Sequence, residues 1–165
     1  MSRILIISDS HGYNEWVEIA IKQARPFDML FHCGDLQCPP EEIEKMAGGP
    51  CYMVRGNCDP RLNLPLTQVV DVEGHRIYMA HGHTLGVGYD LDSLLEEAAA
   101  VEADIALFGH THRPYVDIED DIYLFNPGSV SQPRQESREK TYGILEISDK
   151  GTISFEHKVL GKKQL

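Results

Sequence analysis

The sequence predicts an α/β fold in which two mixed β-sheets pack face to face with helices outside. Early in the chain, apolar runs alternate with helical patterns, which is typical of βαβ units and parallel strands. Later, three pairs of strand-like segments each enclose a short polar turn, which is typical of antiparallel hairpins. The length of 165 residues suits one domain with a full core, so we expect a single domain spanning residues 1–165.

The N-terminal third is expected to alternate strands and helices. Its strands are short apolar runs at residues 3–7, 28–33 and 51–54. From Val17 to Ala24, apolar residues recur at spacings of three and four, which predicts an amphipathic helix with Asn14 as its N-cap. A shorter helix should open at Pro39–Pro40, because proline suits a first turn and acidic residues follow it. This part of the chain therefore reads β, α, β, α, β.

Hairpins dominate the rest of the chain. Their expected arms are residues 69–72 and 76–80, 115–118 and 122–125, and 142–147 and 152–155. Between the first two hairpins, Leu91 to Ala99 predict a helix with Asp90 as its N-cap, and residues 105–108 predict one more buried strand. The last residues, 162–165, are expected to fray.

Side chains that can bind metals follow five of the expected strands. They are Asp9 and His11, Asp35, Asn57, His81, and His110 and His112. Ligands bind at the carboxyl ends of strands in open α/β sheets, so we expect these side chains to lie together. Carboxylate, carboxamide and imidazole in this mixture suit Mn²⁺, Fe²⁺, Zn²⁺, Co²⁺ or Ni²⁺. Seven donors are too many for one ion with open positions, but they suit two ions that share a carboxylate and activate a hydroxide for attack on phosphorus.

The order of these residues resembles the motifs of the calcineurin-like metallophosphoesterase superfamily. The matching motifs are Asp9-x-His11, Gly34-Asp35, Gly56-Asn57-x-Asp59, His81-x-His83 and Gly109-His110-x-His112. The small size and the Asn126-Pro127-Gly128-Ser129 segment resemble its compact bacterial and archaeal phosphodiesterases, to which the eukaryotic retromer small subunit is related. The resemblance implies a four-layer αββα sandwich. It also implies a metal-dependent phosphodiesterase that hydrolyses small phosphodiesters with a metal-bound hydroxide.

The same resemblance implies a role for each site residue. One divalent ion would be held by Asp9, His11, Asp35 and His112, and a second by Asp35, Asn57, His81 and His110, with Asp35 as the bridge. Mn²⁺ is the expected metal. The expected catalytic residues are Asp35, Asn57, Asp59 and His83. Arg61 and Arg134 are expected to bind substrate, because they lie in loops that could overhang the site and guanidinium is a good phosphate partner.

One position departs from the superfamily pattern. Cys58 stands where most members have a histidine that stabilises or protonates the leaving group, although cysteine is also found there in the small branch. The departure predicts weak general-acid catalysis, and the favoured interpretation of Cys58 is a small packing residue. His32, His75 and His157 lie outside the motifs and are expected to be hydrogen-bonded or solvated side chains.

Charge and composition limit the classes of partner that the protein is expected to bind. A net charge of −11 offers no long-range attraction to nucleic acid or to an anionic membrane. No apolar run approaches the roughly 20 residues of a membrane span, and the N-terminal run is too short for a signal peptide. We therefore expect a cytoplasmic protein with reduced cysteines, a small phosphodiester as its substrate, and no membrane or strong nucleic-acid binding; a homo-oligomer stays open.

Two other functions also stay open. A phosphomonoesterase, such as a protein phosphatase, would use the same motifs. A protein-binding scaffold on the same fold, as in the retromer subunit, is the rival from a different class. Proteins of this fold that have become scaffolds usually lose some of the metal ligands. All seven are present here, so the enzyme is favoured.

Overall fold

The computed structural model describes residues 1–161. Within this range the helices are α1 (Asn14–Ala24), α2 (Pro40–Ala47) and α3 (Asp92–Ala100). The strands of the first half are β1 (Ser2–Ile7), β2 (Met29–His32), β3 (Cys51–Met53), β4 (Thr67–Val72) and β5 (His75–Ala80). Those of the second half are β6 (Ile105–Leu107), β7 (Pro114–Glu119), β8 (Ile122–Pro127), β9 (Thr141–Ile147) and β10 (Ile153–Val159). The tail expected to fray, 162–165, lies outside the described residues.

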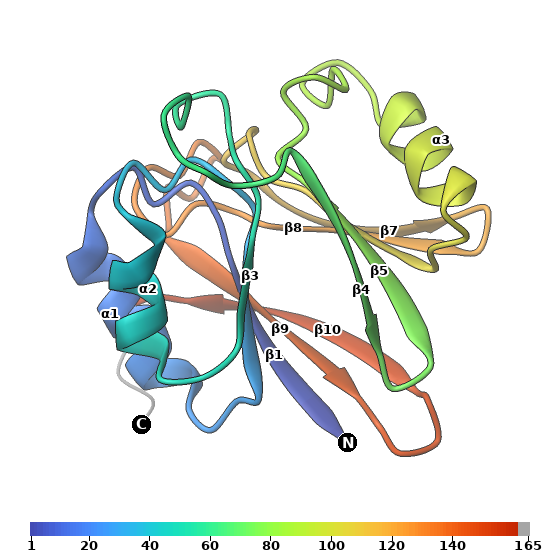
Figure 1. The fold of residues 1–165 in the computed structure, drawn as a ribbon, viewed down its shortest axis with the longest axis horizontal. Helices are drawn as coiled ribbons and strands as arrows, with labels where there is room; N and C mark the ends of the chain where they lie inside the picture. Colours follow the sequence, from blue (N-terminus) through green and yellow to red (C-terminus); the bar gives the residue numbers. More distant parts are fainter. Residues whose placement is uncertain (162–165) are drawn as a thin grey trace.

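The strands form two five-stranded mixed sheets that face each other (Figure 1). The first sheet has the order β10-β9-β1-β2-β3, and the second has the order β4-β5-β6-β8-β7. Strands β1, β2 and β3 are parallel, as are β5, β6 and β8, whereas the outer strands pair antiparallel. Helices α1 and α2 cover the outer face of the first sheet and α3 covers the second (Figure 1). The predicted four-layer αββα sandwich is therefore confirmed.

Strand β1 shows how the sequence builds these layers. Ile4 and Ile6 belong to the core between the sheets, together with Leu107 of the second sheet. Leu5 and Ile7 belong to the separate core beneath α1 and α2. Because both faces of β1 are buried, the strand is an unbroken apolar run instead of an alternating one. A third core lies between α3 and the outer face of the second sheet.

All three predicted hairpins form, but the last one is longer than expected. The sequence pattern ended its second arm at Phe155, whereas β10 continues to Val159 because Lys158 and Val159 still pair with β9. None of the helices in residues 1–161 combines the length and the apolar character needed to cross a membrane.

The two predicted helix caps are wrong. Helix α1 begins at Asn14 itself, whose side-chain amide donates instead to Glu42 Oε2 on α2, at 2.7 Å. Helix α3 has Leu91 at its N-cap position. Asp90 lies one residue earlier, and its Oδ1 accepts the backbone N–H of Asp92 at 3.1 Å. Asn14 therefore bonds to a residue of another helix, and Asp90 bonds to the backbone from the turn that precedes α3.

Candidate metal centre

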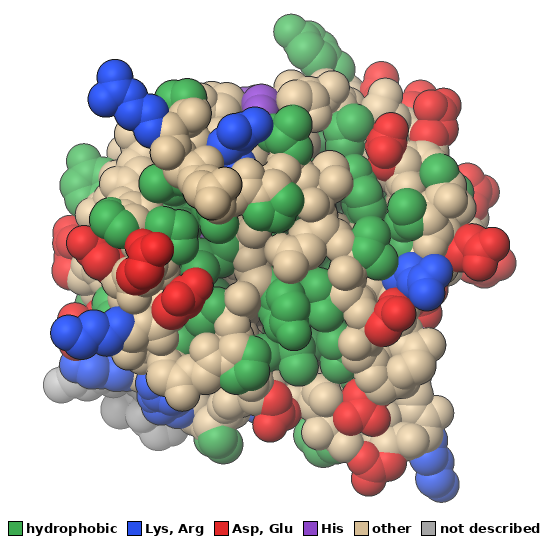
Figure 2. All heavy atoms as spheres, in the orientation of Figure 1, with side chains coloured by type: hydrophobic (Ala, Val, Ile, Leu, Met, Phe, Trp, Pro, Cys, Tyr) green, Lys and Arg blue, Asp and Glu red, His purple; other side chains and the backbone are tan. Residues whose placement is uncertain are grey.

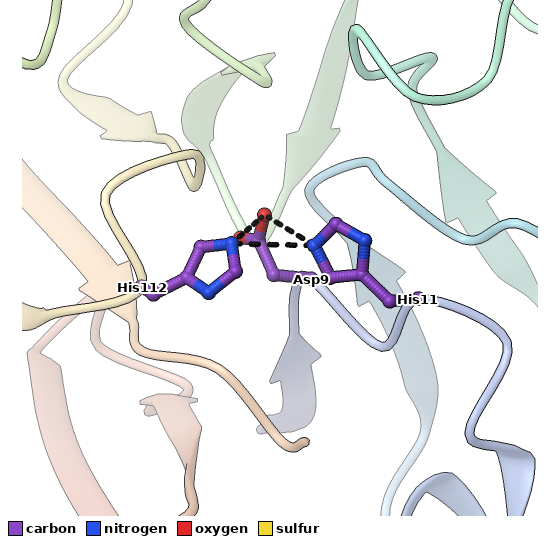
Figure 3. Close-up of side chains that lie close together, drawn as sticks. All are labelled: Asp9, His11 and His112. Carbon is purple, nitrogen blue, oxygen red and sulfur yellow. Dashed lines mark hydrogen bonds and ion pairs between the residues drawn. The ribbon is translucent and has the colours of Figure 1, made fainter. Parts of the chain in front are cut away.

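The loops that follow β1, β2, β3, β5 and β6 converge at one edge of the sandwich. They carry the donor cluster, which we define as Asp9, His11, Asp35, Asn57, His81, His110 and His112. Within the cluster, a first donor group consists of Asp9, His11 and His112, and a second of Asp35, His81 and His110; the ligand atoms within each group lie within 4.8 Å of one another. Figure 3 shows the first group: Asp9 and His11 come from the loop after β1, His112 comes from the loop after β6, and the three side chains point toward one another.

Asp9 supplies a buried oxygen that no hydrogen bond satisfies. Its Oδ2 accepts from Ser8 Oγ at 2.6 Å and from the backbone N–H of His110 at 3.1 Å. Its Oδ1 is buried and accepts no hydrogen bond from any residue in the range 1–161. That atom lies 3.2 Å from His112 Nε2 and 3.8 Å from His11 Nε2 (Figure 3). A buried carboxylate oxygen without a partner is costly, and a cation at this point would satisfy it.

Three histidines of the cluster turn a lone pair toward its interior. In each of them Nδ1 faces an oxygen acceptor: His11 with Gln37 Oε1 at 2.6 Å, His112 with Gln132 O at 2.6 Å, and His81 with Cys33 O at 2.7 Å. A neutral imidazole that donates through Nδ1 has its lone pair on Nε2, which is how metal-binding histidines are held. The Nε2 atoms of His11 and His112 are only 3.2 Å apart. Two lone pairs at that distance repel, so a cation fits between them.

The second donor group has the same character. Nε2 of His81 lies 3.1 Å from Asn57 Oδ1, 3.2 Å from Asp35 Oδ2 and 3.3 Å from His110 Nδ1. Asn57 is exposed at the mouth of the cluster, whereas His81 is fully buried. These four atoms together match the donor chemistry of a divalent metal site.

Asp35 faces both groups. Its Oδ2 lies 3.2 Å from His81 Nε2 and 3.7 Å from His11 Nε2, and its Oδ1 accepts the backbone N–H of Cys58 at 2.8 Å. Burial acts to raise the pKa of Asp35, but when the ring of His81 is protonated its hydrogen bond and charge outweigh burial and hold the pKa of this carboxyl below its ordinary value. Asp35 is therefore an ionised carboxylate placed between the two groups.

The backbone is strained where it presents these side chains. The φ angle is 54° at Asp9, 49° at His11, 57° at Asp35, 70° at His110 and 59° at His112. The left-handed conformation costs a non-glycine residue about 1–3 kcal/mol and concentrates at functional sites. Contacts from distant parts of the chain hold it; the hydroxyls of Ser129 and Ser131 both donate to the backbone oxygen of Asp9, at 2.8 and 2.9 Å.

Glycines let the loops approach closely. A Cβ atom at Gly56 would lie 2.1 Å from Asp35 Oδ1, and one at Gly109 would lie 2.1 Å from Ser8 Oγ. Both distances are far shorter than any real contact, so only glycine fits at these positions. The glycines of these two motifs therefore serve packing between ligand loops.

Asp59 is buried and joins two of the loops. Its Oδ2 accepts the backbone N–H groups of Leu36 and Gly56 at 3.1 and 3.0 Å, and its Oδ1 accepts that of Gln37 at 2.9 Å. The carboxylate thus ties the Asp35 loop to the Asn57 loop from beneath. It contributes no atom to either donor group.

The other predicted site residues lie around the cluster at different distances. The ring centroid of His83 is 5.4 Å from that of His81, and its Nδ1 is buried without a hydrogen-bond partner among the residues that the structure describes. Burial lowers the pKa of His83. Arg61 is exposed and lines a cavity of about 280 Å³ beside Cys58. Arg134 is also exposed, and only its backbone N–H touches the cluster, at 3.0 Å from the backbone oxygen of His112.

Cys58 stands among the donors and not in the core. Its Sγ lies within 4.8 Å of ligand atoms of both His11 and Asp35. Burial and the charge of Asp35 raise the pKa of the thiol. The packing interpretation drawn from the sequence does not describe this position, because the thiol faces the ligand atoms.

The three histidines outside the motifs are hydrogen-bonded, as expected. His32 lies 2.9 Å from Ser10 Oγ and accepts the backbone N–H of Gly34 at 3.0 Å. His75 is held between the carboxylate of Asp104 and the backbone oxygen of Gly151. His157 donates to the backbone oxygen of Asn126 at 2.7 Å.

Sequence reasoning missed two residues of the site. Gln37 orients His11 through the 2.6 Å contact described above. Arg55 lines a cavity together with Asn57 and His83. Arg55 directly precedes the Gly56-Asn57 motif, so its position at the end of a strand was a usable signal; Gln37 offered none, because its role depends on the shape of its loop.

Comparisons with known proteins agree with this geometry. Residues 2–150 match the calcineurin-like phosphoesterase superfamily domain. The chain is 32% identical over 154 residues to the probable metallophosphoesterase YsnB of Bacillus subtilis, covering 92% of this chain and 89% of that protein. It is 37% identical over 101 residues to the phosphodiesterase YfcE of Escherichia coli, covering 56% of this chain and 50% of that protein.

A solved structure shows the same relationship. The crystal structure of a conserved Streptococcus pneumoniae protein, described as a predicted phosphoesterase, superposes with a TM-score of 0.83 at 32% identity and covers 97% of this chain and 93% of its own. The sandwich, the ordered motifs and these similarities agree, and the chain belongs to the calcineurin-like phosphoesterase superfamily.

Proposed function

We propose that this protein is a phosphodiesterase that hydrolyses small phosphodiesters with a pair of divalent metal ions, preferably Mn²⁺. The observation that carries the proposal is the position of Asp35, whose Oδ2 lies between His11 of the first donor group and His81 of the second. A carboxylate shared by two groups of ligands suits a two-metal centre. The similarity to YfcE, a phosphodiesterase, favours diesters as substrates.

The donors present fit such a pair. Asp9, His11, Asp35 and His112 would hold one ion, and Asp35, Asn57, His81 and His110 would hold the other. The unsatisfied Oδ1 of Asp9 and the closely spaced nitrogens of His11 and His112 are the features that a cation would relieve. Two such ions, when bound, lower the pKa of a water molecule and neutralise charge that develops on the phosphate.

The chain's own residues position and support this chemistry. Gln37 and the backbone oxygens of Cys33 and Gln132 fix the imidazole orientations, so the ligand atoms need not reorganise. His83 lies beside His81 with a free nitrogen, where it can hydrogen-bond an oxygen of the substrate. Attack by water in line with the leaving group needs no nucleophilic side chain, so we propose a mechanism without a covalent enzyme intermediate.

The alternatives differ from this proposal in what they require. A protein-binding scaffold does not need oriented ligands, whereas three histidines here have their outer nitrogens held by hydrogen bonds. A phosphomonoesterase would share the ligands, and substrate preference separates it from a diesterase.

The test combines metal analysis with kinetics on bis(4-nitrophenyl) phosphate and 4-nitrophenyl phosphate. We expect about two ions per chain, loss of diesterase activity on chelation, and recovery with Mn²⁺. Asp35→Asn should lower kcat on the order of 10³-fold or more, and His83→Ala about 10- to 100-fold. Asp121→Asn, an exposed carboxylate in the β7–β8 turn, is the matched control and should leave kcat unchanged.

Each contrary result points to a different error. Activity that survives exhaustive chelation would exclude the metal mechanism. A strong preference for the monoester would replace the diesterase by a phosphatase. A metal-loaded protein that hydrolyses neither substrate would favour the scaffold.

A further inference from the structure

Besides the cavity that Arg61 lines, two larger cavities adjoin the loops that carry the donor cluster. The Arg55 cavity, of about 330 Å³, is lined by Arg55, Gly56, Asn57, Pro60, Leu66 and His83. The acidic cavity, of about 530 Å³, lies between the start of α3 and β7, and its charged lining residues are Asp90, Asp92, Arg113 and Glu119. Both could receive the part of a substrate that extends beyond the scissile phosphate, and their charges differ.

Arg55 is a partly buried cation without a counter-ion. Its backbone N–H donates to the oxygen of Pro65 at 2.8 Å, but within residues 1–161 its guanidinium makes no ion pair and no hydrogen bond. The chain has 26 acidic and 15 basic residues, so acidic partners are abundant elsewhere. Holding a guanidinium partly out of water without a partner is costly, and an anion that enters the cavity would offset the cost.

The charge around the two cavities predicts which one an anion enters. The lining of the Arg55 cavity includes no carboxylate, whereas that of the acidic cavity has three carboxylates and one arginine. On the face drawn in Figure 2, acidic side chains gather at the upper right, over α3, while a basic side chain stands near a histidine at the upper rim. An anionic extension is therefore attracted to the Arg55 cavity and repelled from the other.

The Arg55 cavity is continuous with the donor cluster. Asn57 belongs to both, and its Oδ1 lies 3.1 Å from His81 Nε2. His83 forms another part of the wall, with its ring centroid 5.4 Å from that of His81. Pro60 and Leu66 add apolar surface. A diester whose phosphorus lies over the cluster can thus extend a short stem along apolar atoms toward the guanidinium.

We propose that the Arg55 cavity is a subsite for a second anionic group, so that the preferred substrate is a phosphodiester with a terminal phosphate or carboxylate on one of its ester groups. This inference rests on the proposed function, because the diester is bound at the same cluster. Phosphate and carboxylate each present two oxygens that accept parallel hydrogen bonds from a guanidinium. The subsite is therefore expected to bind either anion.

The kinetic test uses three 4-nitrophenyl diesters whose second ester group is a stem of equal length ending in a phosphate, a carboxylate or a methyl group. The Mn²⁺-loaded wild type should prefer at least one anionic diester. Arg55→Gln should lower kcat/KM for that diester about 10- to 100-fold, and for the methyl-ended one less than about threefold. Arg55→Lys should restore part of the preference, since lysine keeps the charge but not the fork. Of the two anionic diesters, the one whose hydrolysis Arg55→Gln slows more carries the preferred end group.

Arg113→Gln is the matched control, because it removes the same charge from the acidic cavity. It should leave the preference for anionic diesters intact. The subsite is refuted if the wild type shows no preference, if Arg55→Gln slows all three diesters equally, or if Arg113→Gln causes the selective loss. Since the Arg55 side chain bonds to nothing else in the described residues and its unpaired burial is costly, Arg55→Gln should unfold at or above the wild-type temperature.

A binding measurement separates this inference from the proposed function. Calorimetry on the Mn²⁺-loaded protein compares propane-1,3-diyl bisphosphate with propyl phosphate. Arg55→Gln should weaken binding of the bisphosphate about 10- to 100-fold and leave the monophosphate unchanged. Selective bisphosphate binding without any diester hydrolysis would retain the subsite and refute the enzyme. Hydrolysis without any selectivity in either assay would retain the enzyme and refute the subsite.

Discussion

His32 lies beneath the donor cluster and is completely buried. Its Nδ1 accepts the backbone N–H of Gly34, so the ring is neutral and its Nε2–H donates to Ser10 Oγ. Burial lowers the pKa of His32 to about 4, because the charged ring would lose its contact with water. Protonation would also place an N–H against the Gly34 N–H. The loops after β1 and β2 thus share a support that requires a neutral imidazole.

Metal-free protein should therefore lose stability on acidification through His32. The unfolded chain binds a proton at a pKa of about 6.5, whereas the native chain does so only near pH 4, so this contribution is complete above pH 6.5 and lost as the pH falls to about 4. Its size is about 3 kcal/mol at most. Urea unfolding of chelated wild type and His32→Gln at pH 4.5, 5.5 and 7 measures it. The variant should show the shallower pH dependence, and parallel curves would contradict the burial argument.

A second prediction about a single residue concerns the thiol of Cys58. Without an imidazole near the leaving oxygen, the rate should depend steeply on the pKa of the leaving group. Cys58→Ala should change kcat/KM on a nitrophenyl diester by less than about tenfold, because a thiol is a weak hydrogen-bond donor. Cys58→His should help alkyl diesters more than aryl ones, by about 10- to 100-fold. A series of diesters with graded leaving groups gives these values.

A collapse of Cys58→Ala on every substrate, with folding and metal content intact, would show that the thiol itself takes part in the reaction. Its Sγ is close enough to the ligand atoms of His11 and Asp35 for that outcome to be informative.

The sequence predicted the convergence of the seven donors because each follows a strand, and strand ends meet at one edge. It did not predict what supports them. Gln37 contacts His11 only because of the shape of its loop. Ser129 donates to the backbone oxygen of Asp9 across more than a hundred residues of sequence. Arg55 was missed although it directly precedes the Gly56-Asn57 motif, because spacing does not reveal that its guanidinium has no partner in the described residues.

At the scale of elements, the end of β6 packs directly against the end of β1 through Gly109. A methyl group there would meet Ser8 Oγ at 2.1 Å and Asp9 Oδ2 at 2.8 Å. Gly109→Ala should therefore displace Asp9, lower metal affinity at least about tenfold and destabilise the fold by about 1–3 kcal/mol. Metal titration and thermal unfolding measure the two effects.

Gly49→Ala is the control for that change, since a Cβ at Gly49 meets no atom within 4 Å. It should bind metal like the wild type. Equal metal affinity in both variants would mean that the approach of β6 to Asp9 does not matter for the ligands.

Element types were predictable and element ends were less so. Apolar runs and turn residues identify β1 and the β4–β5 hairpin, since burial on both faces and a two-residue turn leave clear patterns. The caps of α1 and α3 were wrong because Asn14 and Asp90 can satisfy their side chains in several ways, and only tertiary structure selects one.

At the scale of the whole molecule, the donor cluster joins the two sheets. Asp9, His11, Asp35 and Asn57 follow strands of the first sheet, and His81, His110 and His112 follow strands of the second. A metal ion bound by both would oppose their separation. Binding at 100 times its dissociation constant should stabilise the native state by about 2.7 kcal/mol and raise the melting temperature by about 5–10 °C.

Calorimetric melting with and without Mn²⁺ checks this coupling, and Asp35→Asn should lose most of the increase while Asp121→Asn keeps it. An unchanged melting temperature in protein shown to hold the metal would contradict a link between the sheets.

The strand order of the first sheet has a consequence for the timing of assembly. Strand β1 lies between β2, made soon after it, and β9, which begins at Thr141. All seven donors have been synthesised by His112, yet Asp9 then still lacks Ser129, Ser131 and the strand that flanks β1. Contacts so distant in sequence form late. We therefore expect a chain still attached to the ribosome to bind metal poorly until β9 has emerged. Metal binding would then be one of the last steps in the synthesis and folding of the protein.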